Sequence, residues 1–351
     1  MSYPTVATDS FVPASELLER VESLFAGCGM STRDAHLLAD SLVAADVRGV
    51  HSHGVIRVPD YVRKLVHEGV DPKGTPELVR EFGATGTMDA HNAMGQIACA
   101  AAMQEAIARS SQYGVGVVSI RGSNHCGALF YPAMHAISAG MIGIVATNAL
   151  PTMAPWGGSD KILGINPIAV AIPSGGEPPI VFDAAFSMSS HGKIRVYAQK
   201  GLELPPGWAF DQSGQPTTNA ELALEGLLQP IGAFKGIGLA MLSGILSSFL
   251  SGAAFGTELG DMVNGPKPGL DGQFVMALNI AAFEEPDRFR ARVDRLVRQI
   301  RESTPAPGFD RCYSPGELEY ETESRYRADG IPLSAETLRG LSECERALAT
   351  R

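Results

Sequence analysis

The sequence has few cysteines, and none of them forms a C-x-x-C pair. An odd number of widely spaced cysteines is typical of free thiols in a reducing compartment, and it gives no spacing for a zinc site. We therefore expect a cytoplasmic protein without a disulfide framework. The five cysteines are Cys28, Cys99, Cys126, Cys312 and Cys344.

Basic runs and long apolar runs are also absent. The chain has 28 Lys and Arg against 38 Asp and Glu, a formal charge of −10, and no basic run that could follow a phosphate backbone. Its first 20 residues do not resemble a secretory signal. The longest apolar stretch, Ile237 to Leu250, has 14 residues, whereas crossing a bilayer takes roughly 20. We expect neither a nucleic-acid nor a membrane partner, and we interpret this stretch as a buried helix.

The glycine fingerprints of common nucleotide folds are missing. Three Gly-x-Gly pairs begin at Gly27, Gly114 and Gly236, but a different residue occupies the third glycine position each time, namely Thr32, Ser119 and Met241. The standard Rossmann fingerprint is therefore absent. Neither a P-loop nor a G-x-S-x-G motif occurs. Any nucleotide must be held in another way.

Hydrophobic periodicity predicts helices at the start of the chain and an α/β region after them. Three helices are expected near 17–25, after Ser31 and after Pro59, and a small-residue helix near 95–111. One sheet covered by helices is expected beyond that. Its strands are predicted at 115–120, 141–148, 166–173, 178–185 and 273–280, and its helices near 187–200, 234–250 and 286–302. The last 40 or so residues look helical and are expected to rejoin the first three helices.

The stretch "VRGVHSHGVIRVPDYV" (47–62) places two histidines close to an arginine. An imidazole has an unperturbed pKa near ~6.5, so His53 can exchange a proton at neutral pH with little tuning. Arg57 can hold a carboxylate through two parallel hydrogen bonds. Together they would bind a small acid and protonate its carbonyl oxygen. For an isolated His-Ser-His, however, a solvated turn is the default interpretation.

A metal site is a further alternative for His51 and His53. It needs more ligands, and His125, His191 or Asp183 would have to converge in space, because no ligand spacing specifies them. A metal-dependent hydrolase built on His51, His53 and His125 is therefore kept as a hypothesis from another class.

Three other features have both functional and structural interpretations. The cluster "RGSNHCG" (121–127) follows a predicted strand, where ligand sites tend to form, but its composition is also ordinary turn chemistry. The Pro- and Gly-rich segment 148–167 is a long loop of the kind that is often functional, and its Trp156 is either core or site. Lys235 lies at the start of an apolar helix, where it would meet a phosphate or simply be solvated.

Six stretches, in this order, resemble the malate/L-lactate dehydrogenase superfamily, which is separate from the Rossmann-fold lactate and malate dehydrogenases. They are "HSHGVIRVPDY" (51–61), "GVGVVSIRGSNHCGALFY" (114–131), "ATNALPTMAPWGG" (146–158), "LGINPIAVAIP" (163–173), "VFDAAFSMSSHGKI" (181–194) and "PIGAFKGIGLAM" (230–241). The superfamily includes enzymes that act on sulfolactate, ureidoglycolate, diketogulonate and cyclic imino acids. The matches extend over nearly the whole chain.

The resemblance implies an α/β fold with a non-Rossmann three-layer mixed-sheet nucleotide domain and a helical domain formed from both chain ends. The expected boundaries are residues 1–72 with 306–351 for the helical domain and 73–305 for the nucleotide domain. It also implies a homodimer that uses NAD or NADP and a small carboxylate substrate. The missing glycine fingerprint then follows from the fold.

The resemblance also assigns site residues. It implies that His53 is the proton donor, with Ser52 and Arg57 near the substrate, and that His125 lines the site and is the acid or base in some members. We rank His53 first. Cofactor contacts are implied for Asn148, Phe182, Asp183, Ala184, Ala185, Phe186, Ser187, Met188, Lys235, Pro315, Gly316 and Glu317.

Two positions depart from the family pattern. Ile165 replaces a threonine whose hydroxyl lies near the substrate carboxylate in cyclic-imine reductases, so a hydrogen-bond donor is exchanged for an apolar surface. Phe186 stands where a small or polar residue is usual and is expected to crowd the cofactor-facing turn. The substrate pocket is therefore expected to be drier or differently shaped.

These features favour reversible hydride transfer between a nicotinamide and C2 of a small 2-oxo or 2-hydroxy acid. The alternative within the same superfamily is reduction of the C=N bond of a pyrroline- or piperideine-type carboxylate, which Ile165 disfavours. A nucleotide-binding protein without turnover is a further alternative. The sequence does not specify NAD or NADP, because the acidic residue that follows Rossmann glycines has no counterpart here.

Overall fold

The computed structural model describes residues 10–199, 201–259 and 267–350. Its centre is a seven-stranded mixed sheet in the order β2-β3-β4-β13-β5-β8-β9. Within this sheet β3 pairs with β4 in parallel and the other neighbouring strands are antiparallel. The strands are β2 (Glu77–Phe82), β3 (Thr85–Asp89), β4 (Val115–Ser123), β13 (Asp271–Asn279), β5 (Met141–Thr147), β8 (Ile168–Ile172) and β9 (Ile180–Ala184).

All five predicted strands are present, but the β2–β3 hairpin was not predicted. β2 reads "ELVREF" and is exposed along most of its length. An edge strand of this kind has no continuous apolar run, so hydrophobicity alone does not reveal it.

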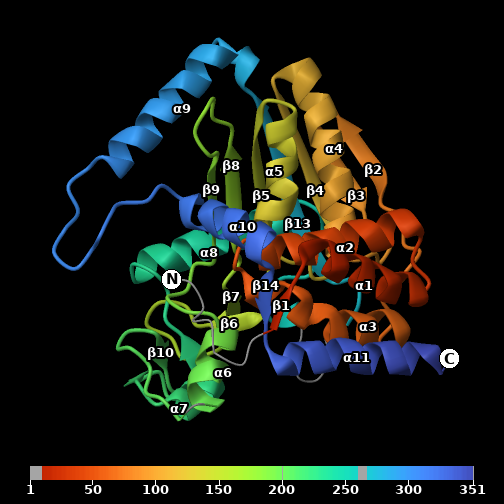
Figure 1. Cartoon of the computed structure of the whole chain (residues 1–351), viewed down its shortest axis with the longest axis vertical. Helices are drawn as coiled ribbons and strands as arrows, with labels where there is room; N and C mark the ends of the chain where they lie inside the picture. Colours follow the sequence, from red (N-terminus) through yellow and green to blue (C-terminus); the bar gives the residue numbers. More distant parts are fainter. Residues whose placement is uncertain (1–9, 200, 260–266, 351) are drawn as a thin grey trace.

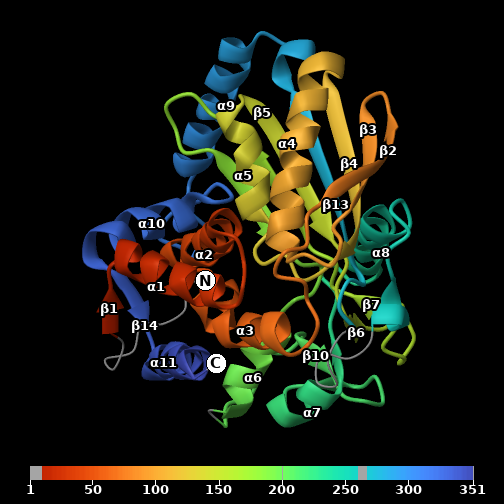
Figure 2. The same cartoon turned by 90° about the vertical axis from the view of Figure 1, so that its right-hand side faces the viewer.

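Helices cover both faces of the sheet. The alanine-rich α4 (Gly95–Tyr113) and α5 (Phe130–Ser138) pack on one face, and α8 (Phe234–Ser248) packs on the other, against β13, β5 and β4. Figure 2 shows α4 and α5 in front of the strands and α8 on the far side of the sheet from them. The layers are therefore helix, mixed sheet and helix, as expected.

The interpretation of 237–250 as a buried helix is wrong for the single chain. The small residues of α8, among them Gly244 and Ser247, are buried. Leu239, Leu242 and Leu246 point outward and are 45%, 61% and 36% exposed. Small residues let the helix approach the sheet closely, which leaves the large apolar side chains on the opposite face.

Both chain ends contribute to a helical part beside the sheet. Its helices are α1 (Ala14–Gly27), α2 (Thr32–Val47), α3 (Val58–Val66), α10 (Glu317–Asp329) and α11 (Ala335–Ala349). Ser31 caps α2 by accepting the backbone N–H of Asp34 at 3.1 Å, as its sequence position predicts. β1 (Ser10–Val12) pairs with β14 (Ile331–Leu333), which joins the two ends. Figure 1 shows the red and dark blue segments together in this region.

The predicted domain boundaries are not clean limits of packing. The apolar core of the helical part also includes Ala93, Met94 and Ile97, from the start of α4 and the residues just before it. A third apolar cluster, which was not predicted, is built from short elements between residues 150 and 240 and contains Met153, Phe186 and Ile194. Those elements are β6 (Pro151–Met153), β7 (Leu163–Gly164), α6 (His191–Gln199), β10 (Ala209–Phe210), β11 (Pro216–Thr217), α7 (Ala220–Glu225) and β12 (Leu227–Leu228). The remaining elements are the short turns η3 (Gly256–Leu259) and η4 (Ile280–Ala282) and the amphipathic α9 (Pro286–Arg301).

Within the described ranges, every helix is too short or too polar to cross a membrane.

Gly95 lets α4 approach the loop that follows β4. A Cβ at this position would overlap the carbonyl oxygen of Asn124 and lie 2.7 Å from Cα of Cys126. We expect Gly95→Ala to lower the free energy of unfolding by about 1–3 kcal/mol, because overpacking forces the backbone to shift. Urea denaturation measures this change. Gly192→Ala is the control, because no atom lies within 4 Å of its added methyl group; equal stability of the two variants would contradict the close approach.

Candidate active site

Two short 3-10 turns, η1 (His51–His53) and η2 (Val55–Arg57), connect α2 to α3. The buried carboxylate of Asp46 holds them together. It contacts Nδ1 of His51 at 2.7 Å and accepts the backbone N–H of Val55 at 2.7 Å. Gly54 is required beside it, because a Cβ there would overlap this carboxylate. Burial raises the pKa of Asp46, and these contacts oppose the rise.

Asp46 was not among the predicted site residues. An acidic residue at the end of an apolar helix has no distinguishing pattern in the sequence, and only its burial reveals its role.

Arg57 and Ser52 are placed by hydrogen bonds within the turn. Nε of Arg57 donates to the carbonyl oxygen of Ser52 at 2.8 Å, and the Ser52 hydroxyl lies 3.0 Å from Nδ1 of His53. The Arg57 side chain stays 30% exposed and has a long ion pair with Asp60, at 3.5 Å. A guanidinium in this position can still bind a carboxylate.

The structure brings His53 together with His125, which lies two residues beyond the end of β4. Their rings are nearly parallel, at an angle of 12°, with centroids 5.9 Å apart. Desolvation and the nearby Arg57 lower the pKa of His53 to about 4. Desolvation, His53, Arg57 and Lys64 lower the pKa of His125 well below its usual value. The expectation of an imidazole with an unperturbed pKa is therefore wrong, because burial favours the neutral form of both rings.

Three residues of the same region were not predicted. The Tyr61 hydroxyl lies 2.7 Å from Nδ1 of His125, and Nε2 of Gln96 donates to the Tyr61 oxygen at 3.0 Å. Lys64 is 7% exposed, and its charge acts on His125. Arg57, Tyr61 and Lys64 are spaced i, i+4, i+7, so they share one helix face, and this spacing was available in the sequence.

Lys64 also lies near Asp271, at the start of β13. Burial lowers the pKa of Lys64 and raises the pKa of Asp271 to about 6, and the attraction between the two opposes both shifts. Lys64 and Asp271 thus lie on the β13 side of the site, and the positive charge of Lys64 acts on His125.

Two segments that the resemblance assigns to the cofactor are neighbours in the structure. The carbonyl oxygen of Pro315 accepts the N–H of Val181 at 3.0 Å, which places the 315–317 turn beside β9 and the 182–188 segment. Gly316 has φ +88°, and a Cβ there would lie 2.9 Å from the Val181 oxygen. Phe182 and Met188 are 42% and 48% exposed.

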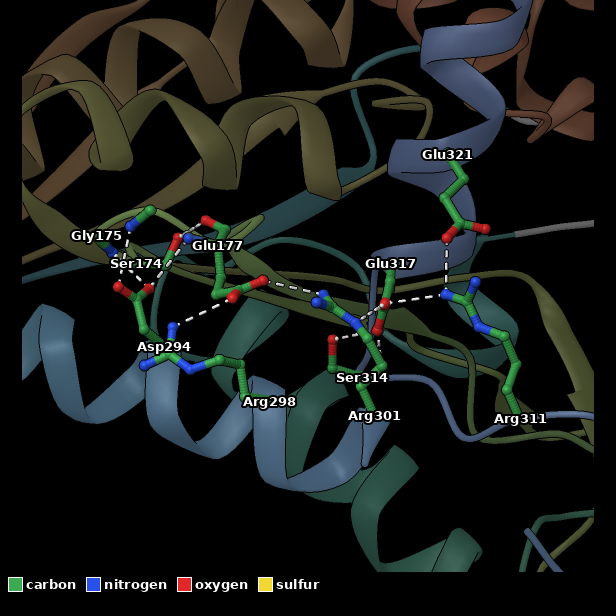
Figure 3. Close-up of polar contacts among 11 residues, drawn as sticks. Ser174, Gly175, Glu177, Asp294, Arg298, Arg301, Arg311, Ser314, Glu317 and Glu321 are labelled. Atoms are coloured by element: carbon green, nitrogen blue, oxygen red, sulfur yellow. Dashed lines mark hydrogen bonds and ion pairs between the residues drawn. The ribbon is translucent and has the colours of Figure 1, made fainter. Parts of the chain in front are cut away.

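Glu317 has a structural role that the resemblance did not imply. Its buried carboxylate accepts from the backbone N–H and hydroxyl of Ser314, both at 3.0 Å, from Arg301 Nε at 2.8 Å and from Arg311 at 3.0 Å. Figure 3 shows Glu317 between the two arginines. The same network anchors the β8–β9 loop, since Asp294 of α9 accepts backbone N–H groups from residues 175–177. A direct cofactor contact by the Glu317 carboxylate is therefore not supported.

The side chains of Asn148, which is buried, and Asp183, which is exposed, also form hydrogen bonds within the chain. The Asn148 amide donates to Ser248 at 3.0 Å and to the Ala254 oxygen at 2.8 Å, and its oxygen accepts from Gly272 at 3.2 Å. Asp183 accepts the N–H of Phe130 at 2.8 Å, at the start of α5. These hydrogen bonds position the segments that carry the two side chains, and the cofactor contacts implied for Asn148 and Asp183 stay predictions.

The expectation that Phe186 crowds a cofactor-facing turn is wrong. It is 6% exposed and belongs to the third apolar cluster, and its N–H donates to the Ile165 oxygen at 3.1 Å. Ile165 packs against the same cluster. The Ser187 hydroxyl donates to the Ser189 oxygen at 2.7 Å, and Ala184 and Ala185 are half-buried.

Lys235 is the second residue of α8 and is exposed at its N-terminus, as predicted. The preceding Ala233 has φ +59°, an uncommon conformation for a residue with a side chain. Trp156 is 54% exposed, so its interpretation as a core residue is wrong. It borders a cavity of about 520 Å³ between the loop 154–159 and segments 210–215 and 227–230.

The described residues contain no group of three or more His, Cys, Asp or Glu side chains that could hold a metal ion. The proposed ligand His51 is instead hydrogen bonded to Asp46 and stacks on Tyr326, with ring centroids 6.0 Å apart.

The sequence profile of malate/L-lactate dehydrogenases matches residues 12–342. The chain belongs to this family. Its fold is similar to the crystal structure of malate dehydrogenase from Entamoeba histolytica, with a TM-score of 0.93. The two sequences are 30% identical, and the match covers 97% of this chain and 98% of the other.

Three relatives show the range of reactions within the family. L-sulfolactate dehydrogenase of Methanocaldococcus jannaschii is 38% identical over 90% of both chains. Ureidoglycolate dehydrogenase (NAD(+)) of Escherichia coli K12 is 33% identical over 90% of both chains. A Delta(1)-pyrroline-2-carboxylate/Delta(1)-piperideine-2-carboxylate reductase of Pseudomonas putida is 33% identical over 98% of this chain and 99% of the relative. The chain is thus an oxidoreductase of the 2-hydroxy acid type, and the relatives support a nicotinamide cofactor.

The lowered pKa of His53 predicts an unusual pH dependence. With His53 in its expected role as the base, oxidation of a hydroxy acid needs its neutral imidazole, and a group whose pKa is about 4 stays neutral down to that pH. We expect kcat/KM for oxidation to fall by less than about twofold between pH 8 and pH 5, whereas an unshifted imidazole would leave only about 3% neutral at pH 5. Initial rates measured across this range test it. Arg57→Gln should move the fall to higher pH, and a wild-type fall centred near pH ~6.5 would contradict the shift.

Proposed function

We propose that the protein transfers a hydride reversibly between a nicotinamide and C2 of a small 2-oxo or 2-hydroxy acid. The observation that carries this proposal is the parallel pair of His53 and His125, 5.9 Å apart, beside Arg57. Arg57 orients the substrate carboxylate, and His53 exchanges the proton of the C2 oxygen, with Ser52 on its other ring nitrogen. Positioning of the reacting groups provides much of the rate enhancement.

The charges around the histidines support an anionic substrate. Arg57 and Lys64 both lower the pKa of His125 through their positive charge. A bound carboxylate would offset this charge and raise the pKa of both rings, so that a protonated His53 becomes accessible for reduction of the 2-oxo acid.

NAD or NADP is proposed as the cofactor. The segment 182–188 offers exposed apolar side chains at Phe182 and Met188, and the 315–317 turn lies beside it. Lys235, at the N-terminus of α8, is suited to a phosphate group. These features fit a dinucleotide, which supplies or accepts the hydride when bound. A cytoplasmic location is part of the same proposal and is supported by the cysteine pattern.

A second candidate function is reduction of a cyclic ketimine, for which the relative from Pseudomonas putida is the support. The same arginine would bind the carboxylate, but the apolar Ile165 disfavours this reaction. A spectrophotometric panel of 2-oxo acids and cyclic imino acids with NADH and NADPH distinguishes the two. Binding of NAD(P)H without turnover of any substrate would support the hypothesis of a nucleotide-binding protein instead.

The proposed roles of His53 and Arg57 predict different kinetic losses. His53→Ala should lower kcat by at least about 100-fold and leave NADH or NADPH binding nearly unchanged, because proton transfer is lost. Arg57→Ala should chiefly raise KM, because carboxylate binding is lost. Steady-state kinetics and fluorescence titration measure both.

Matched controls are available for both variants. Arg63→Ala removes an arginine of α3, which is paired with Asp60 and Glu68, and it should leave KM unchanged. His36→Ala removes a surface histidine paired with Glu22. Full activity of His53→Ala would contradict the mechanism.

We also propose that two copies of the chain pair through the exposed face of α8. Leu239, Leu242 and Leu246 form an apolar stripe that continues into Phe249 and Leu250, which are 60% and 56% exposed. Contiguous apolar surface of this kind usually marks a protein interface. A second copy supplies the same stripe, as a two-fold interface requires.

We expect Leu242→Glu to convert a dimer into a monomer, because it places a charge at the centre of the proposed interface. Light scattering coupled to size-exclusion chromatography measures the mass. Leu222→Glu is the control, since Leu222 of α7 is 52% exposed but lies outside the stripe. A wild-type monomer, or a Leu242→Glu dimer as stable as the wild type, would contradict this interface.

A further inference from the structure

We propose that Tyr61 and Gln96 are positioning residues that fix the proton of His125 on Nε2. His125 then acts only as a neutral hydrogen-bond donor toward the C2 oxygen of the substrate, and proton exchange is left to His53. The catalytic part of this inference rests on the proposed function, but the position of the proton does not.

The direction of the hydrogen bonds follows from a backbone donor. The N–H of Gly127 donates to Nδ1 of His125 at 3.3 Å, and a backbone N–H cannot accept. Nδ1 therefore carries no proton, and the Tyr61 hydroxyl, 2.7 Å away, must donate to it. The Tyr61 oxygen in turn accepts from Nε2 of Gln96 at 3.0 Å. The neutral ring must carry its proton on Nε2.

The surroundings hold this arrangement in place. Tyr61 and Gln96 are 2% and 1% exposed, and burial raises the pKa of Tyr61, so its hydroxyl keeps the proton it donates. Gly127 has φ +71°, and a Cβ there would lie 2.8 Å from Nε2 of Gln96. A glycine is therefore needed for both the backbone donor and the amide to reach their partners.

The hydrogen-bond partner of Nδ1 in His53 is a hydroxyl, unlike the backbone N–H that donates to Nδ1 of His125. Nδ1 of His53 faces the Ser52 hydroxyl at 3.0 Å, and a hydroxyl can rotate to donate or to accept. His53 can therefore gain and lose a proton without losing its hydrogen bond. Protonation of His125 at Nδ1 would instead set its N–H against the N–H of Gly127. During oxidation the hydroxyl proton of the substrate passes to His53, and His125 keeps its own proton.

The first test measures the proton directly and needs no substrate. Side-chain ¹⁵N spectra of the histidines in the wild-type protein should show His125 protonated on Nε2 alone at neutral pH. Tyr61→Phe should give a mixture of tautomers or an easily protonated ring, because one of two donors to Nδ1 is lost. A proton on Nδ1 in the wild type would overturn the proposal, whatever reaction the enzyme performs.

The second test is kinetic. Tyr61→Phe should lower kcat about 10- to 100-fold with little change in KM, and the acid limb of the kcat profile should move to higher pH. Gln96→Glu should lower kcat more than Gln96→Met does, because a carboxylate would accept the Tyr61 proton and turn it away from His125. Wild-type kcat and pH profile in Tyr61→Phe would overturn the catalytic role.

Tyr131→Phe is the matched control. The hydroxyl of Tyr131, which is half-buried, donates to Asp40 at 2.6 Å, so this variant also removes a tyrosine hydrogen bond. It should leave the His125 spectrum and the kcat profile as in the wild type. If Tyr61→Phe and Tyr131→Phe differ only in stability, then Tyr61 has a purely structural role and the proposal fails.

Discussion

The hydrogen bond between Tyr61 and His125 joins the two halves on which the site depends. Tyr61 belongs to α3, in the helical part. His125 follows β4, the strand of the central sheet that pairs in parallel with β3. Arg57 and His53 precede Tyr61 on the same segment, so the contact also fixes where the guanidinium and the second imidazole lie relative to His125. The residues of the proposed site therefore come from both parts of the molecule.

Buried carboxylates hold the segments around this contact. Asp46 organises the His-Ser-His turn through hydrogen bonds with the backbone N–H of Val55 and the ring of His51. Glu317 organises the turn beside β9 by accepting from the backbone N–H of Ser314 and from Arg301. Burying a carboxylate is unfavourable unless its oxygens are hydrogen bonded, so each of these groups specifies one local geometry. The loops therefore keep their form although they contain many glycines and prolines.

This division of labour is consistent with a family whose members act on different small acids. In the proposed mechanism, the arginine and the two histidines bind the part of the substrate that all 2-oxo and 2-hydroxy acids share. Ile165 and the loop around Trp156 lie with the third apolar cluster and its cavity, apart from the hydrogen bonds that align the histidines. Substitutions in that region can alter this cavity without removing the hydrogen bonds of the two histidines.

Periodicity and local motifs act over short distances, so the sequence was enough to predict the strands with continuous apolar runs, the capped helix after Ser31 and the return of the C-terminal helices. The roles of His53, Arg57 and His125 are implied by the family resemblance and stay predictions. Tertiary structure alone decided what depends on burial and on contacts between distant segments. It lowered the pKa of both histidines, buried Phe186 in the third apolar cluster, and engaged the side chains of Asn148 and Glu317 in internal hydrogen bonds. It also placed Tyr61 against His125 and Gln96 against Tyr61. It also exposed the large side chains of α8, because hydrophobicity specifies that a helix packs but not which of its faces is small enough to approach the sheet.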